Sequence, residues 1–186
     1  ENVPVGQNVV IPGKSLNELN KILDDSTDLV NVALTSQQVL FKTKEVLFFS
    51  RLLEGNYPDT SRLIPDDYQT NVTINGKSLL QAIDRASLLA REDRNNVVRF
   101  ETVGQNTVEI SSNSPEIGKV KEEITVENLE GDELKISFSA KYMMDALKAI
   151  DGQDVMIQFT GTMKPFILRS IHDDAILQLI LPVRTY

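Results

Sequence analysis

The chain has 186 residues, of which 41% are hydrophobic, 27 are acidic and 19 are basic, so its formal net charge is −8. Cysteine is absent and His172 is the only histidine, which excludes disulfides and thiolate zinc sites and argues against a histidine metal cage or a Ser-His-Asp triad. No apolar run reaches the roughly 20 residues of a membrane span and the first residues do not resemble a signal peptide, so we expect a cytoplasmic protein that needs no cofactor.

An internal repeat organises the sequence. The segment Ile11–Leu16 recurs closely as Ile74–Leu79 and more weakly as Phe138–Met143, which gives a period of about 64 residues. Apolar residues spaced three and four apart then predict an amphipathic helix after each copy, in residues 13–24, 76–94 and 139–150. A serine is expected to cap each helix, because its hydroxyl can accept a hydrogen bond from an unpaired backbone N–H: Ser15, Ser78 and Ser139.

Short strands are expected after each helix, where apolar residues alternate or run together between polar breaks. The expected strands are Leu29–Thr35, Val39–Thr43, Val46–Leu52, Val97–Thr102, Val108–Ser112, Gly118–Val126, Leu134–Phe138, Val155–Thr160, Phe166–Ser170 and Ile176–Leu181. The repeating unit is therefore one helix on about four antiparallel strands, and the sequence predicts an α+β fold built from three such units.

The repeat units are expected to combine in pairs. One helix on a few strands buries too little to form a comfortable domain, whereas two units together reach a typical domain size. Because the count is odd, one domain is incomplete, and we expect the first unit to be its half. Pro58, Pro65 and the polar residues 66–69 mark the junction between this unit and the following pair.

The charge is distributed unevenly over these units. The helical segments carry a small excess of basic residues, with Lys14, Lys77 and Lys141 at equivalent helix starts, while the strands and loops hold the acidic excess. If the helices lie side by side, their exposed faces form a mildly basic wall that attracts phosphates without reading base sequence. The alternative is that these lysines only keep amphipathic helices in water.

Several collinear segments carry a family resemblance that spans essentially the whole chain. They are Leu52–Pro65, Ala86–Arg91, Ser114–Gly118, Met163–Phe166 and Gln178–Tyr186. These segments resemble the bacterial DNA polymerase III beta subunit, the sliding clamp, in the form typical of low-GC Gram-positive bacteria. The resemblance implies a DNA-clamp fold in which the helices line the inner, DNA-facing surface of a ring made by two subunits of three domains each.

The resemblance also implies the domain organisation and the function. Residues 1–68 would be the second half of the middle domain and residues 69–186 the entire C-terminal domain. The chain would then be a piece of a longer protein, and we do not expect this piece to close a ring by itself. A complete clamp is a non-catalytic processivity factor of DNA replication. It encircles duplex DNA as a homodimer and tethers the DNA polymerase III alpha subunit, the clamp loader and repair polymerases.

Site residues follow by matching positions to the family. Partners would insert a short hydrophobic segment into a cleft, whose apolar wall and few polar groups come from Pro58, Arg62, Leu63, Pro165, Leu179, Leu181, Pro182, Val183 and Arg184. Leu88 and Leu89 match the apolar pair offered to the neighbouring subunit. Lys14 matches a basic inner-surface position, and helix placement adds Arg85, Arg91 and Lys141 as DNA-facing candidates.

Two other functions remain open at this point. An enzyme would rest on the acidic pairs Asp24–Asp25, Asp66–Asp67, Glu122–Glu123 and Asp173–Asp174, since paired carboxylates bind Mg²⁺ or act as acid and base. Neighbours on a strand point to opposite faces, however, so these pairs are more typical of turns and solvated edges. The second alternative is an acidic, β-rich module that binds peptides and has no role on DNA.

Overall fold

The computed structural model describes residues 8–23, 29–55, 57, 59–65, 67–90, 96–150, 154–173 and 175–184. The chain divides into two compact parts, the N-terminal body Glu1–Asp59 and the C-terminal body Thr60–Tyr186. Within the described ranges, no helix has the length and apolar character needed to cross a membrane.

The N-terminal body consists of one helix and one small sheet. Helix α1 (Gly13–Ile22) is followed by the antiparallel strands β1 (Asn31–Leu34), β2 (Gln38–Lys42) and β3 (Leu47–Arg51). Among its described side chains, burial is confined to Leu19, Val39 and Ser50. Many large apolar side chains of this body stay exposed: Leu16, Ile22, Leu29, Val30, Val32, Leu34, Leu47, Phe49 and Leu53.

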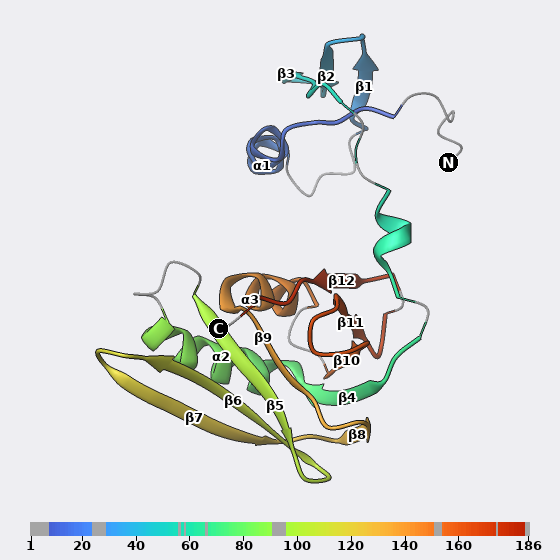
Figure 1. The fold of residues 1–186 in the computed structure, drawn as a ribbon. Coiled ribbons are helices and arrows are strands. Elements are labelled where there is room, and N and C mark those ends of the chain that lie inside the picture. Colours follow the sequence, from blue (N-terminus) through green and yellow to red (C-terminus); the bar gives the residue numbers. More distant parts are fainter. Residues whose placement is uncertain are drawn as a thin grey trace. The chain divides into compact units, whose positions relative to one another are not determined.

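The C-terminal body contains two sheets and two α-helices (Figure 1). Its elements are η1 (Thr60–Leu63), β4 (Thr70–Asn75), α2 (Gly76–Ala90), β5 (Val97–Val103), β6 (Thr107–Ser114), β7 (Gly118–Thr125), β8 (Asn128–Gly131), β9 (Lys135–Ser139), α3 (Ala140–Ala149), β10 (Asp154–Phe159), β11 (Phe166–Ser170) and β12 (Leu177–Ile180). The strands form a five-stranded sheet of order β12-β11-β10-β4-β8 and a four-stranded sheet of order β7-β6-β5-β9. Helix α2 packs on the four-stranded sheet, with α3 beside it.

The two repeats of the C-terminal body exchange their leading strands. Strand β4 runs into α2 but pairs with β10, whereas β9 runs into α3 but pairs with β5. The exchange is reciprocal at the level of single hydrogen bonds, because the N–H of Glu127 donates to the carbonyl of Thr73 over 2.9 Å and the N–H of Val183 donates to that of Ser137 over 2.7 Å. Neither repeat can therefore complete its sheet without the other, which explains why two units make one domain.

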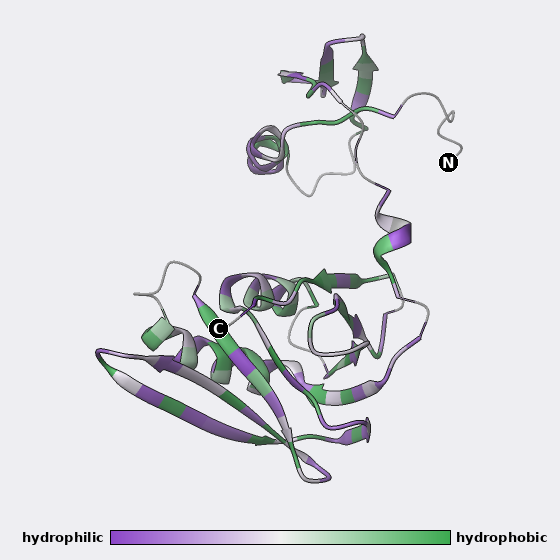
Figure 2. Cartoon of the chain, in the orientation of Figure 1, coloured by the Kyte–Doolittle hydropathy of each residue, from purple (hydrophilic) through white to green (hydrophobic). Residues whose placement is uncertain are grey.

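Side chains from both repeats fill one continuous core. Its centre is a chain of aromatic contacts, in which Phe159 lies 5.3 Å from Phe100 and 4.9 Å from Phe166, and Phe138 lies 5.7 Å from Phe166, measured between ring centroids. The strands supply these rings by alternation: buried and partly buried residues alternate along β5, and hydrophobic and hydrophilic residues alternate along the strands in Figure 2. Both helices and both sheets contribute side chains to this core, so its packing fixes the positions of the surface residues considered below.

The expected α+β fold and the three helices are confirmed, and each expected strand is present within two residues of its predicted bounds. The expected strands did not include β4 and β8. The second helix ends at Ala90 among the described residues, and its expected continuation to 94 lies outside them.

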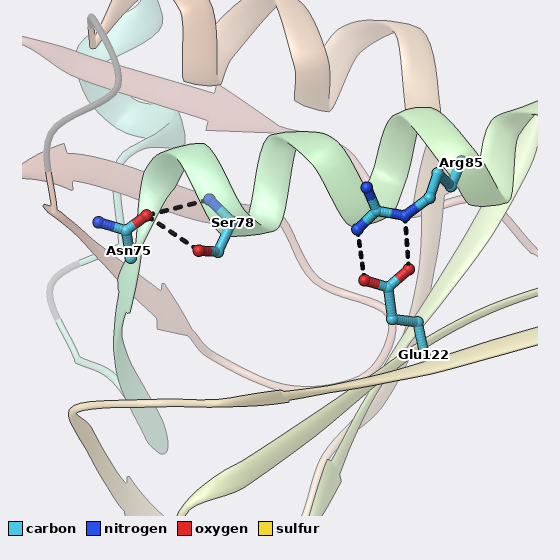
Figure 3. A network of polar contacts seen from close by, with 4 residues as sticks. All are labelled: Asn75, Ser78, Arg85 and Glu122. Atoms are coloured by element: carbon cyan, nitrogen blue, oxygen red, sulfur yellow. Dashed lines mark hydrogen bonds and ion pairs between the residues drawn. The ribbon is translucent and has the colours of Figure 1, made fainter.

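Two of the three expected helix caps are wrong. Helix α1 is preceded by Pro12, and Ser15 lies inside the helix, where its hydroxyl accepts a hydrogen bond from the hydroxyl of Ser50 over 2.8 Å. Ser78 also lies inside its helix, α2. Asn75 performs the capping there, because its Oδ1 accepts hydrogen bonds from the N–H and the hydroxyl of Ser78 over 3.0 and 3.1 Å (Figure 3). Ser139 is the N-cap of α3 as predicted, although its side chain makes no capping hydrogen bond.

Candidate functional site

The segment after β12 connects the two sheets of the C-terminal body. Pro182 has no backbone N–H, so it cannot extend the ladder of β12 as an ordinary residue would. The chain instead moves beside β9, where Pro182 forms a bridge with Phe138 and Val183 donates its hydrogen bond to Ser137. Predicted cleft residues 182–184 are therefore held against the edge of the four-stranded sheet.

An apolar ledge lies next to this segment. Ile180 points into the core, so Leu179 and Leu181 point to the opposite face of β12, where Leu179 is half-buried and Leu181 is 62% exposed. Ile167 of β11 pairs with Leu179 in register and is fully buried. Pro165 directly precedes β11, and its carbonyl accepts a hydrogen bond from the hydroxyl of Thr160 over 3.1 Å. We call Pro165, Ile167, Leu179 and Leu181 the apolar ledge.

A hollow with a volume of about 450 Å³ opens beside Val183 and Arg184. Its lining comes from the four-stranded sheet, from the turn between β10 and β11, and from the C-terminal segment: Arg99, Lys135, Ser137, Thr162, Met163, Val183 and Arg184. We call it the Arg99 hollow. Of the residues predicted for the cleft, Val183 and Arg184 line it.

The remaining predicted cleft residues have different positions. Arg62 and Leu63 lie on η1, where both are exposed, and neither of them lines the Arg99 hollow. Pro58 falls outside the described residues. The structure therefore brings Pro165, Leu179, Leu181, Pro182, Val183 and Arg184 together at neighbouring strand ends through the pairing of β11 with β12 and of Pro182 with Phe138.

The predicted subunit interface residues lie near the end of α2. Leu88 is 54% exposed, whereas Leu89 is half-buried. Helix α2 contacts β7, one of the two edge strands of the four-stranded sheet. An exposed leucine beside an open strand edge is a typical interface feature, because both the apolar side chain and the edge can be covered by another chain.

The predicted DNA-facing residues differ in how their charge is compensated. Lys14 on α1 and Lys141 on α3 are exposed. Arg85 on α2 instead forms two hydrogen bonds with the carboxylate of Glu122 on β7, including one from Nε to Oε2 over 2.9 Å (Figure 3). These bonds lower the pKa of Glu122 and raise the pKa of Arg85. Arg91 lies outside the described residues.

The acidic pairs offer no assembled catalytic group in the described part of the chain. Glu122 binds Arg85, while Glu123 is exposed on the other face of β7. No group of three or more His, Cys, Asp or Glu side chains is arranged to hold a metal ion among the residues that the structure describes. Asp24, Asp25, Asp66 and Asp174 lie outside those residues.

Residue-level reasoning missed Arg99, Lys135 and Ser137 as members of a surface hollow. The alternation of β5 indicates that Arg99 points outward, but only the pairing of β5 with β9 places it beside Ser137. Met163 could have been found, since it belongs to the segment Met163–Phe166 that carries part of the family resemblance.

Comparisons with known proteins show which family the chain belongs to. The family model for the DNA polymerase III beta subunit, C-terminal domain, matches residues 61–184, and the model for its central domain matches residues 1–59. The beta sliding clamp of Bacillus subtilis strain 168 is 63% identical over 179 residues, which cover 96% of this chain and 47% of that protein. The beta sliding clamp of Staphylococcus aureus strain COL is 56% identical over 186 residues, 100% of this chain and 49% of that protein.

A solved structure of the Bacillus subtilis DNA polymerase sliding clamp has a TM-score of 0.89 and 62% sequence identity to this chain. The match covers 97% of this chain and 47% of that one. This chain therefore spans about half the length of the curated relatives it matches.

Proposed function

Because the chain belongs to the DNA polymerase III beta subunit family, we propose that it serves as part of a sliding clamp, a non-catalytic processivity factor for DNA replication in the cytoplasm. Residues 1–68 would be the second half of the middle domain and residues 69–186 the C-terminal domain. The whole clamp would encircle duplex DNA as a homodimer and tether the DNA polymerase III alpha subunit, the clamp loader and repair polymerases by their short hydrophobic segments.

The single observation that best supports partner binding is the apolar ledge. Leu181 leaves most of its side chain in water although Ile180, directly before it, is buried, and Leu179 and Pro165 lie beside it. An apolar partner segment that covers Leu181 would remove this surface from water. Val183 and Arg184 continue the same wall, while Arg62 and Leu63 on η1 are proposed to contribute the other wall.

The exposed apolar surface of the N-terminal body supports its assignment as half a domain. In the C-terminal body, α2 packs against α3 and each repeat completes the sheet of the other. The described part of the N-terminal body has one helix and one sheet, with side chains such as Leu29 and Phe49 left in solvent. We infer that a second helix-and-strands unit of the whole clamp covers this surface.

Ring closure is proposed to use the end of α2 and the edge of β7. Leu88, with Leu89 behind it, would enter an apolar interface with a neighbouring subunit, and the open edge of β7 would pair with a strand of that subunit. DNA would be held loosely, through exposed basic residues such as Lys14 and Lys141 that contact phosphates and leave base sequence unread. Weak, sequence-independent contacts permit sliding, and the closed ring prevents dissociation.

Peptide titration tests the proposed cleft. The probe is a fluorescently labelled synthetic peptide that carries the clamp-binding segment of a DNA polymerase III alpha subunit, and the readout is fluorescence anisotropy. Because this chain supplies only part of the cleft, we expect binding weaker than the micromolar affinity that is ordinary for an isolated peptide, and replacing Arg62 and Leu63 by alanine should weaken it further. Ile117→Ala serves as a control, because Ile117 is similarly exposed on the turn after β6. Equal binding by all three proteins would remove the site assignment.

The alternative function, an acidic peptide-binding module that never meets DNA, is favoured by the net charge of −8. A chimaera that joins this chain to the remaining residues of the Bacillus subtilis clamp distinguishes the two functions. A sliding clamp is retained on circular DNA and lost once the DNA is linearised. A peptide-binding module shows no salt-dependent association with either form.

A further inference from the structure

We propose that the Arg99 hollow binds acidic side chains in the part of a partner that flanks its hydrophobic clamp-binding segment. This inference rests on the function proposed above and adds the chemistry of a second contact. It concerns a surface that is separate from the apolar ledge but continuous with it through Val183 and Arg184.

The position of Arg99 leaves its guanidinium accessible on the outer face of the four-stranded sheet. Val98 and Phe100 are fully buried on the inner face, so Arg99 points outward. Its neighbours in register are Ser111 on β6 and Ser137 on β9. Ser137 lines the Arg99 hollow beside the half-buried arginine, and its hydroxyl can donate a hydrogen bond to an anion.

On this face of the sheet, the carboxylates of two acidic residues pair with lysines and not with Arg99. The carboxylate of Glu101 pairs with Lys135 over 2.9 Å, and that of Glu109 pairs with Lys121 over 3.0 Å. Among the described residues no carboxylate forms an ion pair with Arg99. Both of these acidic groups are therefore already occupied by lysines.

The side chains that line the hollow carry a positive charge overall. Its lining includes three cations, Arg99, Lys135 and Arg184, and no acidic residue from the described part of the chain, although the whole chain has a net charge of −8. The rest of this lining consists of hydroxyl groups and of the apolar side chains of Met163 and Val183. A carboxylate fits this site because a guanidinium can bind it through two parallel charge-assisted hydrogen bonds.

The location identifies the occupant as a peptide. Pro182 and Val183 are tied to β9, so the apolar ledge and the Arg99 hollow lie at the two ends of one short stretch of chain. A partner segment whose apolar residues cover Leu181 needs only to continue past Val183 to bring its next residues to Arg99. Acidic residues at that point would complement Arg99 and Arg184, since Lys135 is already paired with Glu101, and this favours an acidic peptide over a nucleic acid as the ligand.

Flanked peptides test this inference. The clamp-binding segment of a DNA polymerase III alpha subunit is synthesised with three acidic residues, or with three matched Asn and Gln residues, on its amino or its carboxyl side. Only one of the two flanks should reach the hollow. We therefore expect one of the two acidic peptides to bind the chain about three- to tenfold more tightly than the neutral peptide with the same flank position, the range given by one or two exposed ion pairs. The advantage should largely disappear in about 0.5 M salt, where exposed charges are screened.

Substitutions then locate the effect. Arg99→Gln should abolish the acidic advantage, Arg99→Lys should retain part of it, and Lys119→Gln should leave it intact, because Lys119 is a cation of the same sheet that does not line the hollow. Equal affinity of acidic and neutral peptides for the unmodified chain would overturn the inference and leave the proposed function standing. Failure of every peptide to bind would overturn both.

Two further outcomes would also reject the acidic-peptide site. If Lys119→Gln reduces the acidic advantage as much as Arg99→Gln does, the advantage comes from the overall positive charge of the sheet, and the hollow is not a specific binding site. If a short DNA duplex displaces the acidic flank while the neutral peptide stays bound, the hollow binds nucleic acid instead.

Discussion

The guanidinium of Arg85 on α2 binds both carboxylate oxygens of Glu122 on β7, and this two-point contact joins the helix to an edge strand of its sheet. The two residues lie 37 positions apart in the sequence. The contact lies about one helical turn before Leu88, so it orients the end of α2 at the proposed subunit interface.

The first prediction concerns the titration of Glu122. The hydrogen bonds from Arg85 favour the ionised carboxylate, so its pKa in the folded protein should lie below the ordinary glutamate value of about 4.3. The stabilisation by this pair is present above the ordinary pKa and is lost as the pH falls through the lower folded value. Carbon-detected NMR of the Glu122 carboxyl measures the midpoint, and Arg85→Gln should move it upward. A midpoint that does not respond to Arg85→Gln would contradict the contact.

The second prediction separates the DNA-facing candidates. In the chimaeric clamp, Lys141→Gln should lower the slope of log affinity against log salt by about one, because Lys141 is exposed and can contact a phosphate directly. Arg85→Gln should change the slope less, since Arg85 would first have to leave Glu122. Duplex DNA binding at a series of salt concentrations provides the measurement. A larger effect of Arg85→Gln would mean that DNA breaks the pair.

The internal repeat made most of the fold predictable. It would also have predicted strand β4, which was not among the expected strands. The strand expected at Leu134–Phe138 leads into the third helix, and the period of about 64 residues places its counterpart at Thr70–Ile74. Strand β4 occupies that position, at Thr70–Asn75. Strand β8 was beyond this reasoning, because Asn128–Gly131 shows no alternating pattern and forms a strand by pairing with the edge of β4.

The surface residues were predictable only in part, for a different physical reason. Family resemblance marked Leu181, Val183 and Arg184, which lie close together in the sequence. The contact between Arg85 and Glu122 and the position of Arg99 beside Ser137 instead depend on which strands and helices become neighbours. The exchange of leading strands places Arg99 beside Ser137, whereas the packing of α2 on β7 within one repeat places Arg85 beside Glu122, and no local pattern in the sequence specifies either arrangement.

The third prediction tests the close approach of β8 to the residue before β4. Gly131 has a φ of +102°, and a Cβ placed there would lie 1.9 Å from the carbonyl oxygen of Gln69. Gly131→Ala should therefore lower the free energy of unfolding by about 2–5 kcal/mol, from an unfavourable backbone conformation and from overpacking. Gly104→Ala is the matched control, because Gly104 also has a positive φ, +68°, but a Cβ added to it would meet no atom within 4 Å.

Urea denaturation measures both free energies. The control should lose only about 1–2 kcal/mol, the cost of the left-handed conformation alone. Equal losses in the two variants would mean that the backbone of Gln69 moves away from Gly131 at little cost.

The last prediction uses two adjacent residues that differ in burial. Ile180 belongs to the core, so Ile180→Ser should destabilise the chain by about 2–5 kcal/mol. Leu181 is exposed on the apolar ledge, so Leu181→Ser should change the free energy of unfolding by less than about 0.5 kcal/mol.

If the ledge receives the hydrophobic segment of a partner, the same substitution should weaken binding of the labelled alpha-subunit peptide about 5- to 30-fold, because a leucine contact worth about 1–2 kcal/mol is lost. Leu181→Met, which keeps an apolar side chain of similar volume, should restore most of the affinity. A Leu181→Ser variant that folds normally and binds the peptide with unchanged affinity would show that Leu181 does not contribute to peptide binding.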